Sequence, residues 1–249
     1  MQRRTALLLP LLLCAAAGRS FPVFDNMFFR GKPPTDADGL TLSNIVYQDT
    51  IWPHDRGYGT LPPRPAFEAV VRANDLNPGP LVLDIERMPL KGSAETIRRN
   101  LDVLATLADW ARAAAPGKLV GYYGSNTLTR VPVASRDAAL ELAVHVTALF
   151  PPMYTFDDER DAWARRAEAE AAEARALGPG KPVYFYLWPQ YHDNTPRQFE
   201  FVDADYWMFQ LRTASRLADG IVLWGSGKFD WSDATGWWAA TRRFMQEVR

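Results

Sequence analysis

The stretch of sequence that decides the fold is Gly79-Pro80-Leu81-Val82-Leu83-Asp84-Ile85-Glu86. Its apolar, β-prone residues predict a buried strand that leads into two carboxylates spaced i and i+2. In a strand, this spacing turns both side chains toward the same face. An inner strand of a closed parallel barrel would aim Asp84 and Glu86 at the C-terminal mouth, where such folds hold their chemistry. A structural role competes, because Asp84 could cap the next helix and Glu86 could pair with Arg87 or Arg98 in solvent.

Around this stretch, short β-prone runs alternate with helical segments. The β-prone runs are 22–24, 44–48, 81–86, 118–123, 153–156, 182–187 and 221–224. The helical segments are 93–115, 136–150, 158–177, 205–217 and 233–248. This alternation predicts a parallel sheet. We expect one domain over residues 21–249, a single (β/α)7-8 TIM-like barrel of the α/β class. An open doubly wound sheet is the alternative, but no Gly-rich phosphate loop follows the first strand.

The composition is that of a folded protein, with 249 residues and a formal charge of -1. Nothing in this balance predicts electrostatic capture of nucleic acid. The nine Trp and nine Tyr are more informative. Such rings serve sugar-binding clefts as flat apolar platforms with polar edges, although large barrel cores also hold many aromatic residues. We expect a monomer.

The first residues resemble an export signal, with Arg3 and Arg4 before an apolar stretch over 6–17. Small residues at 15–18 then suit cleavage, so we expect a signal peptide over residues 1–18 and a secreted or periplasmic location. The apolar stretch is short for a transmembrane helix, which argues against stable membrane insertion. Cys14, the only cysteine, follows Leu13 rather than a small residue, so a lipoprotein anchor is the less favoured alternative.

The ends of successive predicted strands share carboxylates or large polar aromatic residues. They read Asp84-Ile85-Glu86, Tyr122-Tyr123-Gly124, Met153-Tyr154-Thr155, Tyr186-Leu187-Trp188 and Leu223-Trp224-Gly225-Ser226. In a barrel these ends converge on one mouth. Two carboxylates held close in a partly dry site separate in pKa, as the cleavage of a glycosidic bond requires. The pattern therefore predicts a site that cleaves or binds sugars.

Other chemistries lack support in the sequence. The three histidines, His54, His145 and His192, are far apart and have no ligand-like spacing. No G-x-S-x-G motif is present to mark a nucleophilic serine. We expect no metal and no cofactor.

The same motifs, in the same order, resemble the hyaluronidases of the animal and venom type, which are (β/α)-barrel endo-β-N-acetylhexosaminidases. The likeness spans roughly Asn44 to Ser226. It rests on Asn44-Ile45-Val46-Tyr47, Leu83-Asp84-Ile85-Glu86, Gly121-Tyr122-Tyr123-Gly124, Leu149-Phe150-Pro151-Pro152-Met153-Tyr154, Pro182-Val183-Tyr184-Phe185-Tyr186 and Gly220-Ile221-Val222-Leu223-Trp224-Gly225-Ser226.

The resemblance implies a role for each matching residue. Glu86 would be the general acid/base, and Asp84 would orient and polarise the substrate's N-acetyl group, whose oxygen is the nucleophile in this substrate-assisted exception to the two-carboxylate scheme. Tyr154 would lie beside the acetamido group. The expected substrate-binding residues are Tyr47, Tyr123, Tyr186, Trp188 and Trp224. The expected partner is a polysaccharide or oligosaccharide.

The sequence also departs from the family. Arg87-Met88-Pro89-Leu90 follows Glu86, where the family carries an acidic residue and then Trp, and the family's disulfides are absent. An N-acetylhexosamine polymer other than hyaluronan therefore suits the chain at least as well. Two alternatives stay open. One is a non-catalytic carbohydrate-binding barrel, and the other is a glycosidase in which Asp84 or a distant residue such as Asp193 is the nucleophile or base.

Overall fold

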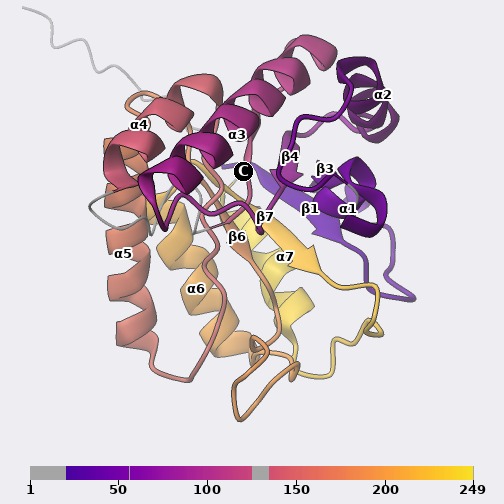
Figure 1. The fold of residues 1–249 in the computed structure, drawn as a ribbon. Helices are drawn as coiled ribbons and strands as arrows, with labels where there is room; N and C mark the ends of the chain where they lie inside the picture. Colours follow the sequence, from indigo (N-terminus) through magenta and orange to yellow (C-terminus); the bar gives the residue numbers. More distant parts are fainter. Residues whose placement is uncertain (1–20, 56, 125–134, 249) are drawn as a thin grey trace, which may run out of the picture.

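The protein is described by a computed structural model over residues 21–55, 57–124 and 135–248. Its strands form two parallel sheets in the middle of the molecule (Figure 1). One sheet has the order β2-β1-β7-β6 and the other has the order β3-β4-β5. The strands are β1 (Val23–Met27), β2 (Thr41–Leu42), β3 (Asn44–Tyr47), β4 (Leu81–Asp84), β5 (Val120–Tyr122), β6 (Tyr184–Leu187) and β7 (Gly220–Gly225).

Two seams join these sheets into a ring. At the first seam, β2 leads directly into β3, and the amide of Ser43 between them donates to the carbonyl of Asp25 in β1 at 3.0 Å. At the second, residues 149–155 lie between β5 and β6 through parallel bridges that include Tyr123 with Phe150 and Leu149 with Val183. The ring confirms the predicted (β/α) barrel.

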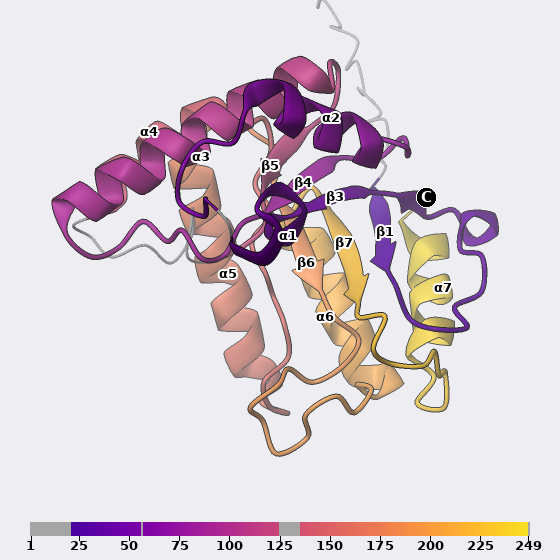
Figure 2. The same ribbon diagram turned by 45° about the vertical axis from the view of Figure 1, so that its right-hand side comes forward.

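The helices form the outer layer (Figures 1 and 2). They are α1 (Gln48–Ile51), α2 (Arg64–Asn74), α3 (Ala94–Ala114), α4 (Arg136–His145), α5 (Arg160–Leu177), α6 (Ala204–Leu217) and α7 (Trp237–Glu247). From α2 onward, each helix packs against the next one in the chain. Because β1, β4 and β6 are covered on both faces, they are buried along almost their whole length, as is usual for parallel sheets.

Three predicted elements differ from the structure. Residues 153–156 form isolated bridges rather than a continuous strand, and Pro151 and Pro152 just before them have no amide hydrogen for a regular ladder. β4 ends at Asp84, so Glu86 follows the strand instead of lying in it. α4 ends at His145, five residues earlier than expected, because Val146 has an extended backbone and the chain turns into the second seam.

The helical spacing of Leu140, Val144 and Leu149 predicts that they form the apolar face of the helix over 136–150, and for Leu140 and Val144 this prediction is wrong. Val144 is 71% exposed and Leu140 is 38% exposed, whereas Ala139, Leu142 and Ala143 are buried. Alanines let the helix lie close to its neighbours α3 and α5, and this close packing outweighs the preference of the larger side chains for the interior. The helical spacing of Ile97, Leu101, Leu104 and Ala108 predicts the apolar face of α3, and the last three are buried whereas Ile97 is half-buried.

The predicted signal peptide, with Arg3, Arg4 and Cys14, lies outside the described residues. Among the helices of the described part, none is long and apolar enough to cross a membrane.

Candidate active site

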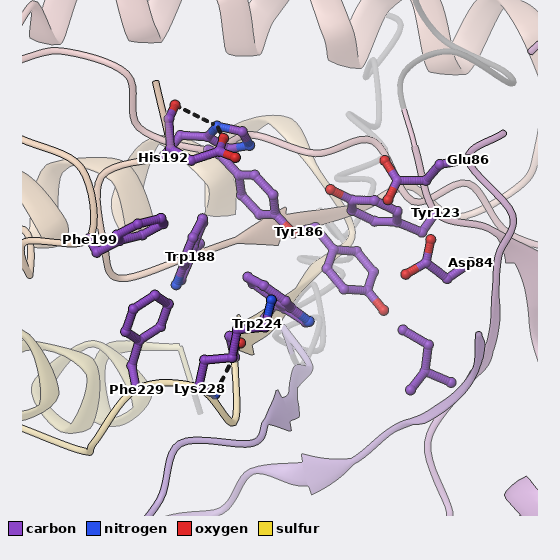
Figure 3. A pocket seen from close by; sticks show the side chains of 14 residues that line it. Asp84, Glu86, Tyr123, Tyr186, Trp188, His192, Phe199, Trp224, Lys228 and Phe229 are labelled. Atoms are coloured by element: carbon purple, nitrogen blue, oxygen red, sulfur yellow. Dashed lines mark hydrogen bonds and ion pairs between the residues drawn. The ribbon is translucent and has the colours of Figure 1, made fainter. Parts of the chain in front are cut away.

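A pocket of about 370 Å³ opens at the C-terminal ends of the strands. Side chains from both sheets and from the loops that follow them line it (Figure 3). The lining residues are Ile45, Asp84, Glu86, Tyr123, Tyr154, Tyr186, Trp188, His192, Asp193, Phe199, Trp224, Ser226, Lys228 and Phe229. The pocket lies where barrel enzymes hold their chemistry.

Asp84, the last residue of β4, places a carboxyl group in the wall of this pocket. Its register partner on β3 is Tyr47. Burial, and then the negative charges of Glu86 and Asp49, raise the pKa of Asp84 to about 7. Desolvation and like charges both disfavour the ionised form. Asp84 and its neighbour Glu86 therefore retain a shared proton far above the pH at which an exposed aspartate loses its own.

Glu86 lies two residues beyond Asp84 and points toward the same pocket (Figure 3). Gln48, at the start of α1, fixes this turn of chain, because its side-chain oxygen accepts from the amides of Glu86 at 3.1 Å and Arg87 at 3.3 Å. Glu86 is exposed as a residue, but its carboxyl group loses part of its hydration in the pocket. This desolvation raises its pKa, while the charge of His192 lowers it. The site thus holds two carboxyl groups with raised pKa values.

Three tyrosines, the buried Tyr154 and Tyr186 and the half-buried Tyr123, form the wall beside the carboxyl groups. The rings of Tyr123 and Tyr186 meet edge to face at 5.0 Å, and the ring of Tyr154 stacks on Trp224 at 6.0 Å. Asn26 of β1 donates to the hydroxyl of Tyr186 at 3.2 Å. Burial raises the pKa of all three phenols. They therefore stay neutral and can donate hydrogen bonds to a polar ligand.

The structure brings seven of the eight predicted site residues into the pocket: Asp84, Glu86, Tyr123, Tyr154, Tyr186, Trp188 and Trp224. Tyr47 is not in the lining and is 38% exposed. Burial raises the pKa of its hydroxyl, a hydrogen bond from Trp224 lowers it, and the nearby charge of Asp84 raises it. Tyr47 therefore adjoins the pocket rather than lining it. The roles assigned to all eight residues stay predictions.

Sequence reasoning missed several lining residues on the loop after β6. His192 faces Asp193 through its Nδ1, and its ring lies 4.8 Å from that of Phe156. Phe199, together with Lys228 and Phe229 after β7, completes the end of the pocket opposite the carboxyl groups (Figure 3). The loop has no periodicity that could have predicted this placement. Within the described part of the chain, no three His, Cys, Asp or Glu side chains gather into a metal site.

No family model matches the sequence, and no curated protein matches it. Solved structures do resemble it. Bee venom hyaluronidase is 16% identical, with a TM-score of 0.65 over 92% of this chain and 98% of that one. The same enzyme in complex with a hyaluronic acid tetramer gives a TM-score of 0.63 over 91% and 96%. A GH18 chitinase from Pseudoalteromonas aurantia is 12% identical, with a TM-score of 0.54 over 89% and 99%.

These structures define the class of fold, a (β/α) barrel of the kind found in glycoside hydrolases. Within that class, the chain has a hyaluronidase-like barrel, as its sequence motifs predicted.

Proposed function

We propose that this protein is a glycoside hydrolase that cleaves a polysaccharide containing N-acetylhexosamine by a retaining, substrate-assisted mechanism. The observation that carries the proposal is the convergence of Asp84 and Glu86 with Tyr154 and Trp224 in one pocket at the barrel mouth. Two carboxyl groups with raised pKa values, beside neutral phenols, suit acid catalysis in a partly dry site.

In the first step, the carboxyl group of Glu86 donates its proton to the glycosidic oxygen as the bond from that oxygen to C1 breaks. The acetamido oxygen of the same sugar attacks C1, so a cyclic oxazolinium forms and no bond to the protein is made. When Asp84 and Glu86 share a single proton and Glu86 holds it, the Asp84 carboxylate can accept a hydrogen bond from the acetamido N–H and balance the positive charge, and the hydroxyl of Tyr154 can donate to the acetamido oxygen. The indole of Trp224 supplies an apolar surface for the N-acetyl methyl group.

In the second step, the Glu86 carboxylate takes a proton from water as that water attacks C1 and opens the ring. The acetamido group is regenerated and Glu86 regains its proton. The configuration at C1 is retained because two displacements have occurred.

The experiment is the release of reducing ends from amino-sugar polymers by the wild type and by the Glu86→Gln variant. We expect the variant to lose at least about a hundredfold in kcat, the usual contribution of a positioned general acid. Glu95→Gln, an exposed change in the first turn of α3, is the matched control and should keep the full rate. Wild-type turnover that survives in Glu86→Gln contradicts the assignment. Saturable glycan binding by the wild type without turnover supports the alternative of a binding barrel.

A second mechanism deserves a test because Asp193 lines the same pocket. If Asp193 or Asp84 were the nucleophile or base, substrates without the N-acetyl group would still be cleaved. NMR of the first-formed product, for N-acetylated and de-N-acetylated polymers, separates the two mechanisms. The substrate-assisted one predicts retention and no cleavage of the de-N-acetylated polymer.

Export of the chain is a further part of the proposal, and it rests on the sequence of residues 1–18 alone, with Arg3 and Arg4 before the apolar stretch. The enzyme would then meet its polysaccharide outside the cytoplasm. N-terminal sequencing of secreted protein tests this, since an intact Met1 would contradict it.

A further inference from the structure

The end of the pocket opposite the carboxyl groups is built by a loop, residues 190–201, that folds back on itself. Gln190 and Phe201 form an antiparallel bridge. Between them, the amide of Tyr191 donates to the carbonyl of Glu200, and the amide of Phe199 donates to the carbonyl of Tyr191, both at 2.9 Å. This arrangement returns Phe199 to the pocket wall, where its ring lies 4.7 Å from that of Phe229 (Figure 3).

The outer side of this loop is tied to the segment before α5. The hydroxyl of Tyr191 donates to Asp158, and Arg197 pairs with the same carboxylate at 2.8 Å. The guanidinium of Arg197 also lies 4.2 Å from the centre of the Tyr191 ring and pairs with Glu200 at 2.8 Å. The loop is therefore held at several points, and the position of Phe199 is fixed in advance of any ligand.

Phe199 has a backbone conformation that a phenylalanine rarely adopts, with φ at +65°. In the same loop, Asn194 has φ at +62°, but asparagine is among the residues that tolerate this region and phenylalanine is not. Such strain persists only where the surroundings over-determine it, and it gathers at ligand sites. The chain therefore keeps a phenylalanine at position 199 despite its backbone strain, although an asparagine, as at position 194, would suit this backbone better.

One buried side chain orients the aromatic residues of this end. The amide group of Gln190 donates to the carbonyl of Phe199 at 2.6 Å and accepts from the indole of Trp188 at 2.9 Å. Gln190 is only 2% exposed, so both hydrogen bonds are shielded from water. The rings of Phe199 and Phe229 stay half-buried, with surface left open to the pocket.

Phenyl rings have no hydrogen-bonding group, so what they bind must offer an apolar face. A sugar ring does so through its axial C–H bonds, while its hydroxyl groups stay at the rim. We propose that Phe199, with Phe229 beside it, forms a second sugar-binding subsite, which stacks on a neighbouring ring of the glycan whose N-acetylhexosamine lies at the carboxyl groups. This inference rests on the proposed function, since it assumes that the pocket holds a glycan.

The test compares a disaccharide and a hexasaccharide of N-acetylglucosamine. Their affinities are measured by isothermal titration calorimetry on Glu86→Gln protein, with and without Phe199→Asn. The asparagine removes the ring but suits the backbone. We expect Phe199→Asn to weaken hexasaccharide binding on the order of tenfold and to leave disaccharide binding within about twofold.

Two control variants accompany this test. Phe199→Tyr, which keeps an aromatic ring at this position, should retain the hexasaccharide affinity. Phe28→Ala, which removes a phenyl ring that is 49% exposed and outside the pocket, should change neither affinity.

If the ring of Phe199 only supported the fold and bound no sugar, the titrations would give a different result. Phe199→Asn would then lower the melting temperature and weaken both oligosaccharides equally, or would change neither affinity, and each of these outcomes overturns the subsite. We expect instead that the melting temperature is kept or raised, because the backbone strain is relieved. Binding with the expected length dependence but no wild-type turnover overturns the proposed function and leaves the subsite standing. The same titrations are made with a disaccharide and a hexasaccharide of hyaluronan, and failure of both series to bind overturns both proposals.

Discussion

Among single residues, Asp84 has the environment that matters most for the proposed chemistry. It ends a strand whose other residues are buried, and it faces the charges of Glu86 and Asp49. An exposed aspartate has a pKa of about 3.9, whereas this one has a pKa of about 7. Between these two values, the pair of Asp84 and Glu86 keeps a proton that ordinary carboxyl groups would have lost.

This proton sets the expected pH dependence. Ionisation of the pair removes the acid that protonates the leaving oxygen, so we expect kcat/KM to be high below about pH 7 and to fall tenfold per pH unit above it. In Asp84→Asn, Glu86 no longer faces a carboxylate, and the fall in the residual activity should move to lower pH. Rates of reducing-end release between pH 4 and 9 measure both. If the fall of kcat/KM at alkaline pH occurs at the same pH in Asp84→Asn, a group other than this pair of carboxyl groups controls it.

Among the elements, the second seam of the barrel requires a very close approach of two backbone segments. A Cβ at Gly121 in β5 would lie 2.2 Å from the carbonyl oxygen of Ala148 and 2.8 Å from the ring of Phe150. The backbone oxygen cannot move without displacing residues 149–155, which bridge β5 to β6. Only glycine therefore lets this seam close.

We expect Gly121→Ala to lower the free energy of unfolding by about 2 to 3 kcal/mol, the usual cost of overpacking. Gly117→Ala is the matched control. Its Cβ meets nothing within 4 Å, and only its φ of +83° opposes the change, at about 1 kcal/mol. Urea denaturation of the two variants gives the comparison, and equal costs would mean that the seam can relax around the methyl group.

The predicted elements show what local patterns reveal. The strand 81–84 and the helix 94–114 were predictable because burial on both faces and helical spacing are written into neighbouring residues. The strand expected at 153–156 and the exposed Leu140 and Val144 were not predicted correctly, because close approach between segments decides them. The residues of the site also fall into a predictable group and an unpredictable one. Strand ends revealed the carboxyl groups and most rings, whereas Phe199 and His192 depend on an irregular loop.

At the scale of the whole molecule, one hydrophobic core runs through both sheets and the helices around them. The site shares this organisation, since Asp84 ends β4 and Glu86 follows it, whereas Tyr186 comes from β6 and Trp224 from β7 of the other sheet. Each sheet buries its inner face against the other sheet, so neither sheet has a complete hydrophobic core alone. The barrel should therefore lose its structure and its pocket together.

We expect a single cooperative unfolding transition in urea. Tryptophan fluorescence, which reports on the tertiary packing around nine Trp that include Trp188 and Trp224 of the pocket, should coincide with far-UV circular dichroism, which reports on the helices. The Glu95→Gln protein should behave identically. Two separated transitions would show that the seams divide the barrel into units that unfold independently.

The pairing of β1 with β7 has a consequence for how the protein is made. Val23 lies beside Ile221 in the register of these strands, so the ring joins its earliest strand to its latest one. While the ribosome is still translating, β1 can reach β2 on one edge, but its other edge waits for a partner not yet synthesised. The nascent chain thus carries an unpaired strand edge until β7 has been synthesised, and a chaperone that binds this edge of β1 would meet no native competitor until then.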